Sequence, residues 1–318
     1  MKILMNVLML SVVIVGLCGI TDAENIVTDG LVSYWTFDRE DIIDNTVKDV
    51  WGENNATIVG TPTIVNGHLK DALKFDGIKD YVNLTTLGDF GAKLDFSTVE
   101  VWIKTDYKET WTTIFKTMGH HGCGNSGVMG WGMDINRTVE NPDDHRQRIQ
   151  MARLDENLKF KDIFPPRLIF GEDVILISLA SFWKNQKGCS SSRGMYRFPI
   201  SDGEWHHLVY TIKHIDENGA EWRESALFID GKLNRISKFS STRNARSKYE
   251  PFSEPVYLGA GNNRGSTEGF FNGIIDEVRI YDRTLTETEI MHNYQSTTGL
   301  AVDRRDKLPT VWGALKKK

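Results

Sequence analysis

One stretch near the carboxyl end constrains the fold of this chain more than any other. Residues 273–281 read Gly-Ile-Ile-Asp-Glu-Val-Arg-Ile-Tyr, a run in which apolar and β-branched side chains dominate. Such a run is typical of a strand in the middle of a sandwich rather than at a half-wetted edge. Because side chains alternate between the two faces of a strand, the pattern predicts the even-numbered residues 274–280 on one face and the odd-numbered residues 275–281 on the other.

The residues after this strand predict a short helix. Thr286 stands where a helix cap is expected, and Glu289 follows three residues later. A threonine and a glutamate at that spacing form a capping box, in which each side chain bonds the backbone N–H of the other residue. A core strand that leads into a capped surface helix indicates the closing element of a fold, on which the upstream chain packs.

The rest of the chain predicts short strands joined by turns. Asn218-Gly219 and Asp230-Gly231 are strong hairpin signals, and Asp76-Gly77 fits another tight connection between strands. The pattern gives about twelve to fourteen strands and no alternation of strands with helices. These features predict an all-β fold, a two-sheet antiparallel jelly-roll sandwich with a short C-terminal helix.

Four stretches carry, in order, the motifs of one family. They are Gly30-Leu-Val-Ser-Tyr-Trp-Thr-Phe-Asp38, Ala72-Leu-Lys-Phe-Asp-Gly-Ile-Lys-Asp-Tyr-Val82, Asp202-Gly-Glu-Trp-His-His-Leu-Val-Tyr-Thr-Ile212 and Gly269-Phe-Phe-Asn-Gly-Ile-Ile-Asp-Glu-Val-Arg-Ile-Tyr281. Together they resemble the LamG-like (laminin G and pentraxin type) family of concanavalin A-like jelly-roll domains. The resemblance implies one such domain over residues 24–299 and a tail over residues 300–318, but one fold hosts many activities.

The first 23 residues have the layout of a secretory signal peptide. Lys2 precedes an apolar run over residues 3–20, and Thr21-Asp-Ala23 ends in small residues, which predicts cleavage after Ala23. A retained membrane anchor is the alternative. A lipid on Cys18 is not favoured, because Leu17 stands where lipidation motifs want a small residue. The mature chain is therefore expected to be secreted, periplasmic or extracellular, with no further stretch that could span a membrane.

The charge of the chain argues against a nucleic-acid partner. The formal net charge is -5, and the basic run Lys316-Lys-Lys318 reads as a solvated tail. Proteins that bind nucleic acid usually carry a basic face or stripe instead.

Residues 117–200 depart most from the family pattern. They are rich in glycine and turn residues, with some strand-like apolar pieces, and they read as enlarged loops. Long loops without regular structure are usually functional or disordered, so this region is the predicted binding surface. Four tryptophans are candidate platforms for a ligand, with packing in the core as the alternative; they are Trp51, Trp111, Trp131 and Trp183.

After removal of the signal peptide, two cysteines remain. Cys123 and Cys189 form an even count in an oxidising compartment, which favours a disulfide bond between them. Zinc binding by Cys123 with His120 and His121 is the alternative. The adjacent His206 and His207 point to opposite faces of a predicted strand, so they are not expected to bind one metal together.

Calcium is the expected cofactor, because the family that the chain resembles often carries it. Asp38 ends the first strand and Asp276 lies in the last, and the resemblance implies that these strands are neighbours. A carboxylate pair suits calcium. The alternative is that the buried Asp276 accepts backbone hydrogen bonds, since an unpaired buried carboxylate is costly.

A late loop is the second candidate for ligand binding. In pentraxin relatives the loop after the strand that resembles Val256-Tyr-Leu-Gly259 supplies calcium ligands for recognition. Here the corresponding residues end in Asn262 and Asn263, amides where those relatives have carboxylates. The resemblance therefore implies a ligand-binding role for these two residues without the relatives' calcium ligands.

The last strand argues against a glycosidase. Jelly-roll glycosidases carry three acids at alternate positions of a Glu-Ile-Asp-x-Glu strand, and glycoside hydrolysis needs two carboxyl groups at a defined separation. Here the matching positions are Ile274, Asp276 and Val278. We therefore expect a non-enzymatic recognition domain for a carbohydrate or glycosylated surface. A structural or protein-adhesion module that contacts an extracellular protein is the alternative, followed by a polysaccharide-acting enzyme.

Overall fold

The computed structural model describes most of the sandwich. The described residues are 26–84, 96–107, 112–116, 130–136, 174–180, 192–197, 200–217, 220–240, 256–263 and 266–300. The predicted signal peptide, Cys18, Cys123, Cys189, most of residues 117–200 and the tail after residue 300 lie outside them. The expectations for those residues stay predictions.

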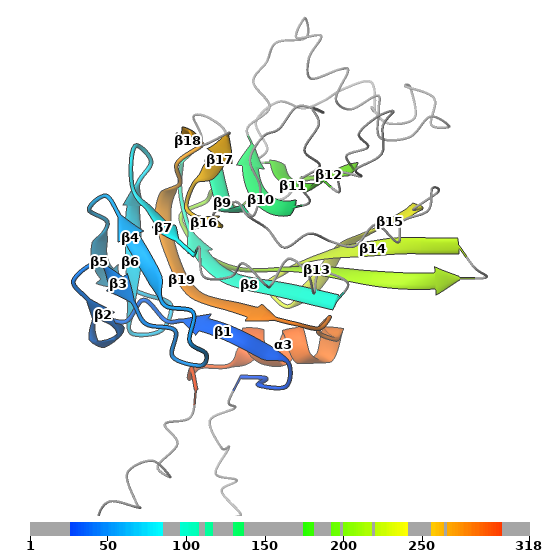
Figure 1. The fold of residues 1–318 in the computed structure, drawn as a ribbon, viewed down its shortest axis with the longest axis horizontal. Helices are drawn as coiled ribbons and strands as arrows, with labels where there is room; N and C mark the ends of the chain where they lie inside the picture. The colour runs from blue at the N-terminus through cyan, green and yellow to red at the C-terminus, as the bar shows by residue number, and fades with distance from the viewer. Residues whose placement is uncertain are drawn as a thin grey trace, which may run out of the picture.

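The described strands form two large antiparallel sheets, as the sequence predicted (Figure 1). Sheet 1 has the order β15-β14-β13-β8-β19-β6-β5. The strand β1 also belongs to it and pairs with the carboxyl-terminal half of β19. Its strands are β1 (Leu31–Trp35), β5 (Thr63–Asn66), β6 (Asp71–Asp76), β8 (Phe96–Lys104), β13 (Trp205–Glu217), β14 (Ala220–Ile229), β15 (Lys232–Ser240) and β19 (Asn272–Tyr281).

Sheet 2 faces sheet 1 and has the order β12-β11-β10-β9-β16-β7-β4-β3-β2. Its strands are β2 (Ile42–Ile43), β3 (Thr46–Val47), β4 (Ala56–Val59), β7 (Tyr81–Asn83), β9 (Thr112–Lys116), β10 (Gly130–Asn136), β11 (Val174–Ala180), β12 (Ser192–Arg197) and β16 (Tyr257–Leu258). A small ribbon pairs β17 (Gly261–Asn263) with β18 (Ser266–Glu268), and a 3-10 turn, η1, spans Arg39–Asp41.

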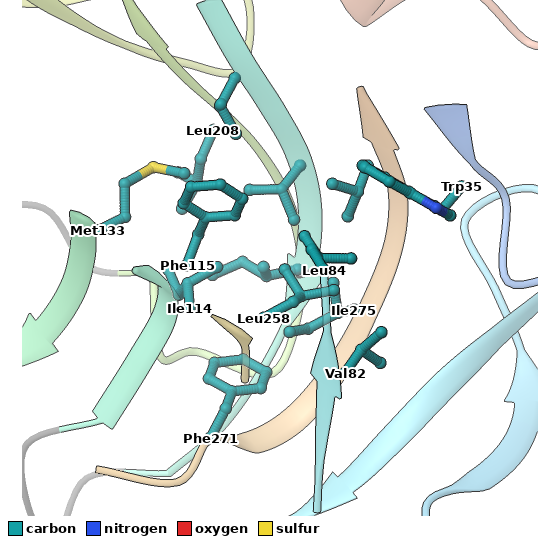
Figure 2. Close-up of a cluster of buried hydrophobic side chains, with 14 of the residues drawn as sticks. Trp35, Val82, Leu84, Ile114, Phe115, Met133, Leu208, Leu258, Phe271 and Ile275 are labelled. Atoms are coloured by element: carbon teal, nitrogen blue, oxygen red, sulfur yellow. The ribbon is translucent and has the colours of Figure 1, made fainter. Parts of the chain in front are cut away.

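The main hydrophobic core lies between the two sheets. Leu208 and Ile275 of sheet 1 meet Phe115 and Leu258 of sheet 2 in one buried cluster (Figure 2). The strands β6, β8, β13 and β14 of sheet 1 send alternate side chains into this cluster, as the sandwich requires. The other face of sheet 1 is covered in part by the helix α3 (Glu287–Gln295).

The two described turns that the sequence singled out behave differently. Asp230 and Gly231 both have positive φ angles, 52° and 72°, and join β14 to β15 as the predicted hairpin. Two central residues with positive φ are what a tight hairpin turn needs. The Asp76-Gly77 connection instead joins β6 of sheet 1 to β7 of sheet 2, because β6 pairs with β5 and β19 while β7 pairs with β4 and β16.

The last strand, β19, contains a bulge that the alternating pattern did not predict. Asp276 lies opposite Trp102 and Arg279 lies opposite Glu100, so three steps along β19 face two steps along β8. The extra residue is Glu277, whose φ of 52° is unusual for a residue with a side chain. The bulge reverses the alternation, and Val278 and Ile280 therefore join Ile275 in the core. The predicted division of this strand into two faces was wrong beyond Asp276.

The helix begins with the predicted capping box. The Glu289 N–H donates to the Thr286 hydroxyl at 3.3 Å, and the Thr286 N–H donates to the Glu289 carboxylate at 2.8 Å. Ile290, on the inner side of α3, belongs to a second apolar cluster with Tyr281 and Val209 of sheet 1. Among the described residues, none of the helices has the length and the apolar composition of a membrane-spanning segment.

Replacing the helix cap tests how strongly α3 is held. We expect Thr286→Ala to lower the free energy of unfolding by about 1 kcal/mol, because the hydroxyl that satisfies an unpaired helical N–H is lost. Urea denaturation followed by circular dichroism measures the change. Thr288→Ala is the matched control on the exposed first turn and is expected to change stability little. Equal effects of the two substitutions would contradict a capping role.

Candidate functional site

A buried ionic cluster lies between sheet 1 and α3. At its centre is Arg279, with a side chain that is only 1% exposed. Its guanidinium forms an ion pair with Glu277 and lies 3.5 Å from the Glu100 carboxylate, measured from Nη1 to Oε2. The same guanidinium lies over the ring of Tyr34, 4.7 Å from its centroid, and the Tyr34 hydroxyl donates to Glu277. The β19 bulge makes this possible, because it places Glu277 and Arg279 on the outer face, whereas regular alternation from Ile275 would turn both into the core.

The helix and the amino-terminal segment complete the cluster through Asn293. The Asn293 amide donates to both oxygens of Glu100, at 3.0 and 2.8 Å, and accepts the Val27 N–H at 2.8 Å. Burial raises the pKa of Glu100, and the positive charge of Arg279 acts in the opposite direction. Asn293 thus joins three parts of the chain that are distant in sequence. This cluster has a structural role, since all of its polar groups are enclosed.

The two predicted calcium ligands have other partners in this structure. Asp276 accepts the backbone N–H groups of His68, Leu69 and Glu277 at 2.8, 3.1 and 2.9 Å. Burial beside the Glu277 carboxylate raises the pKa of Asp276. Asp38 accepts a bond from the Lys70 ammonium at 3.0 Å. This geometry fits the alternative, a backbone-bonding role for Asp276.

The described residues do not form a recognisable metal centre. Within the described ranges, no three or more histidine, cysteine, aspartate or glutamate side chains lie together in a way that could hold a metal ion. Calcium binding by Asp38 and Asp276 therefore stays a prediction. The residues present do not fit it, because the carboxylate oxygens of Asp276 already accept hydrogen bonds.

The two adjacent histidines have separate surroundings. His206 Nδ1 lies 2.9 Å from Asp230 and its Nε2 lies 3.2 Å from Asp202, and these bonds raise the pKa of His206. His207 is fully buried on the outer face of sheet 1, with its ring 5.0 Å from that of Trp102. Burial, with the nearby positive charge of Arg279, lowers the pKa of His207 well below its usual value.

The late loop is described only in its backbone. Asn262 and Asn263 lie in β17, opposite Thr267 and Ser266 of β18. Their side chains lie outside the described part of the structure. A ligand-binding role for these two residues stays a prediction.

Trp51 is the one candidate aromatic platform whose side chain the structure describes. It is 44% exposed, and it is the bulkiest of the exposed apolar side chains among the described residues. Its indole N–H donates to the Leu31 carbonyl at 2.8 Å. One edge of the ring is therefore fixed to β1, while much of the ring remains open to solvent.

Asp49 holds the loop that carries Trp51. The buried carboxylate of Asp49 accepts four backbone N–H bonds at 2.9–3.1 Å, from Tyr34, Trp51, Gly52 and Asn54. At Gly52 the loop lies so close to β1 that an added Cβ would be 2.5 Å from the Val32 carbonyl oxygen. The sequence indicated turn residues here and named Trp51, but it did not identify the role of Asp49. An aspartate two residues before the tryptophan was the only signal, because such side chains often bond the following backbone.

The two acids beside Arg279 are not accessible to a ligand. Glu100 and Glu277 flank Arg279 and are both buried beneath α3. Their carboxylates pair with Arg279, and that of Glu100 also accepts hydrogen bonds from Asn293. An exposed, rigidly held indole can instead stack on an apolar face of a ligand.

Comparison with known proteins supports the family resemblance. Residues 178–291 match the family model described as the concanavalin A-like lectin/glucanases superfamily. This match confirms the resemblance that the sequence motifs indicated. No curated protein sequence matches the chain.

Solved structures share the sandwich at low sequence identity. The binding domain of Paraclostridial Mosquitocidal Protein 1 has a TM-score of 0.52 at 13% identity, over 84% of this chain and 52% of that one. The binding domain of botulinum neurotoxin DC in complex with SialylT has a TM-score of 0.50 at 14% identity, over 86% of this chain and 52% of that one. This chain thus spans about half the length of these toxin domains.

A third solved structure is covered almost completely. Domain 4 of AbnA, a GH43 extracellular arabinanase from Geobacillus stearothermophilus, was solved in complex with arabinotriose. It has a TM-score of 0.49 at 19% identity, over 83% of this chain and 98% of that one. At these identities the toxin domains show a shared fold, the concanavalin A-like sandwich.

Removing the positive charge of Arg279 from the buried cluster should destabilise the fold. We expect Arg279→Met to lower the free energy of unfolding by about 3–5 kcal/mol, because Glu100 and Glu277 are left buried without their counter-charge. Arg283→Met is the control: Arg283 pairs with Glu289 nearer the surface, and its loss is expected to cost about 1 kcal/mol or less. Adding Glu277→Gln to Arg279→Met should recover part of the loss. Urea titrations give all three values, and no recovery would count against the charge argument.

The hydrogen bonds of His206 to Asp230 and Asp202 predict that the stability of the fold depends on pH. Because the folded-state pKa of His206 is raised above its usual 6.5, its bonds stabilise the fold fully below about pH 6.5. That contribution is lost as the pH rises through the folded-state pKa. We therefore expect the difference in unfolding free energy between wild type and His206→Gln to shrink from pH 5.5 to 8.5. His207 is present in both proteins and cancels. A difference independent of pH would refute the assignment.

Proposed function

We propose that this protein is a non-enzymatic recognition domain that binds carbohydrate, and that Trp51 forms part of its binding surface. The observation that carries the proposal is the exposed indole of Trp51, held by its bond to Leu31 on a loop that Asp49 fixes. The predicted signal peptide over residues 1–23 is consistent with export, where such ligands occur.

The chemistry of sugar rings suits such a side chain. A sugar has polar edges and flatter faces of C–H groups, and an aromatic ring can bury such a face while the hydroxyls stay hydrated. Trp51 loses little freedom on binding, because its indole N–H is already bonded to the backbone. A side chain ordered before binding avoids part of the entropy cost of association.

Two further observations support the same class of function. The toxin domain with the same fold was solved in complex with SialylT, and we transfer carbohydrate binding from it only as part of this proposal. The described carboxylates near β19 are buried and bonded, which favours recognition over glycoside hydrolysis. The enlarged loops over residues 117–200 remain the candidate for additional contacts, and an extracellular protein remains the alternative ligand.

Substitution of the tryptophan tests the proposal. We expect Trp51→Ala to weaken binding to the glycan found on an array by at least about tenfold, near 1.4 kcal/mol, because the stacking surface is lost. Trp51→Phe should keep part of the affinity. Ile78→Ala is the control, since Ile78 is 72% exposed in a turn and its loss removes a similar apolar surface. Thermal melts check that each variant is folded.

The outcomes separate the candidate functions. Unchanged glycan binding by a folded Trp51→Ala protein would move the site away from this loop. A wild-type protein that binds no glycan on the array or on insoluble polysaccharides, but captures an extracellular protein, would support the adhesion alternative instead.

A further inference from the structure

A second surface lies on the outer face of sheet 1, outside the cover of α3. Five adjacent strands of sheet 1 run side by side, β13, β8, β19, β6 and β5. Their register places one residue of each directly opposite the next, in one row across the sheet. The row consists of Trp205 of β13, Lys104 of β8, Ile274 of β19, Lys74 of β6 and Thr63 of β5.

Burial of the flanking residues shows which way this row points. Ile103, Ile275 and Phe75 are neighbours of row residues along their strands, and all three are buried in the core between the sheets. Side chains alternate along a strand, so the row projects away from that core. Lys74 and Thr63 are exposed, and the other three members are partly exposed.

The helix comes as far as the neighbouring position on β8, where its Tyr294 stacks on Trp102 at 5.6 Å between ring centroids, two residues before Lys104. The row that contains Glu100 and Arg279 lies farther along the same strands and is closed by α3 through Asn293. One face of the sheet therefore has a covered ionic part and an open part. The open part is what we name the lysine–tryptophan row.

Both lysines of the row are without an anionic partner in the part of the chain that the structure describes. Within the described ranges, neither Lys74 nor Lys104 forms an ion pair, whereas Lys70 nearby pairs with Asp38 and Glu40 at 3.0 and 2.9 Å. Two strand spacings separate their backbones, about 10 Å. The two positive charges thus lie on either side of Ile274, available to a ligand with spaced negative groups.

An aromatic corner ends the row. The ring of His68 stacks on Trp102 at 3.5 Å between centroids and meets Trp205 edge-on at 6.0 Å. Burial and the nearby Arg279 lower the pKa of His68 to about 4, so this ring is neutral near pH 7. The Trp205 indole N–H has no hydrogen bond among the described residues, and its ring is partly exposed.

We propose that the lysine–tryptophan row binds an acidic saccharide. A sugar ring would pack on Trp205, and the carboxylate or sulfate groups along the chain would pair with Lys104 and Lys74. From Trp205 to Lys74 the row spans three strand spacings, about 14 Å, so it suits an oligosaccharide rather than a single sugar. This inference deepens the proposed carbohydrate function by naming the ligand class, and it uses a surface separate from Trp51.

The test uses the full mature chain and three defined polymers. Polygalacturonate carries carboxylates, dextran sulfate carries sulfates, and dextran is neutral. We expect measurable binding of at least one acidic polymer by biolayer interferometry, weaker binding to dextran, and a loss of affinity as salt rises from 50 to about 300 mM. The comparison of the two acidic polymers decides which anionic group is preferred.

Variants of the row give the decisive measurement. Lys74→Gln and Lys104→Gln should each weaken acidic-polymer binding about threefold, and the double variant about tenfold. Trp205→Ala should weaken it further at constant salt, and Trp205→Phe should retain part of the affinity. Lys213→Gln is the matched control, because Lys213 is exposed on the same face of β13, eight residues or roughly 26 Å from Trp205.

Each outcome decides the proposal. Equal losses for Lys213→Gln and the row variants would mean non-specific attraction to net charge and would overturn the proposed row. A row double variant that binds as wild type would also overturn it. If Trp51→Ala alone abolishes glycan binding, the proposed function stands while this inference fails. If only the row variants lose binding, this inference stands and Trp51 is not part of the binding surface.

Discussion

The buried charge of Arg279 is the constraint on which much of this structure depends. A charged group is tolerated in the interior only when its partners are also there. The bulge at Glu277 brings one partner from the same strand, β8 supplies Glu100, and β1 supplies the ring of Tyr34. Asn293 then ties Glu100 to α3 and to the amino-terminal segment at Val27. The helix and the first residues of the domain are thus held to sheet 1 by a polar network as well as by apolar packing.

The two surfaces proposed for recognition lie outside this buried network. The sandwich core is formed between the sheets, so loops and the uncovered part of sheet 1 can vary without loss of the fold. Trp51 lies on a loop that the carboxylate of Asp49 holds in place. The lysine–tryptophan row lies on five neighbouring strands of sheet 1. Both surfaces are held by backbone hydrogen bonds, which is the property that lets a weak contact contribute to affinity.

The same evidence bears on catalysis. An acid–base pair needs access to a substrate. The acids around Arg279 are buried beneath α3, where Glu277 pairs with Arg279 and Glu100 accepts a hydrogen bond from Asn293. The superfamily whose model matches residues 178–291 includes both lectins and glucanases, so the fold by itself does not decide between them.

The sequence by itself determined the sandwich, the capped helix, the Asp230-Gly231 hairpin and the need of Asp276 for partners. These are local properties: alternation of apolar residues, capping spacing, turn residues and the cost of burying a carboxylate. It also named Trp51. Only the tertiary structure decided the bulge, because β19 carries apolar side chains on both faces, and the shift of alternation at Glu277 cannot be read from such a pattern. It alone joined Glu100, Arg279 and Asn293, and aligned Lys74, Lys104 and Trp205. Strand register is set by packing and hydrogen bonds between segments far apart in the chain, and no short-range pattern encodes which residues will face one another.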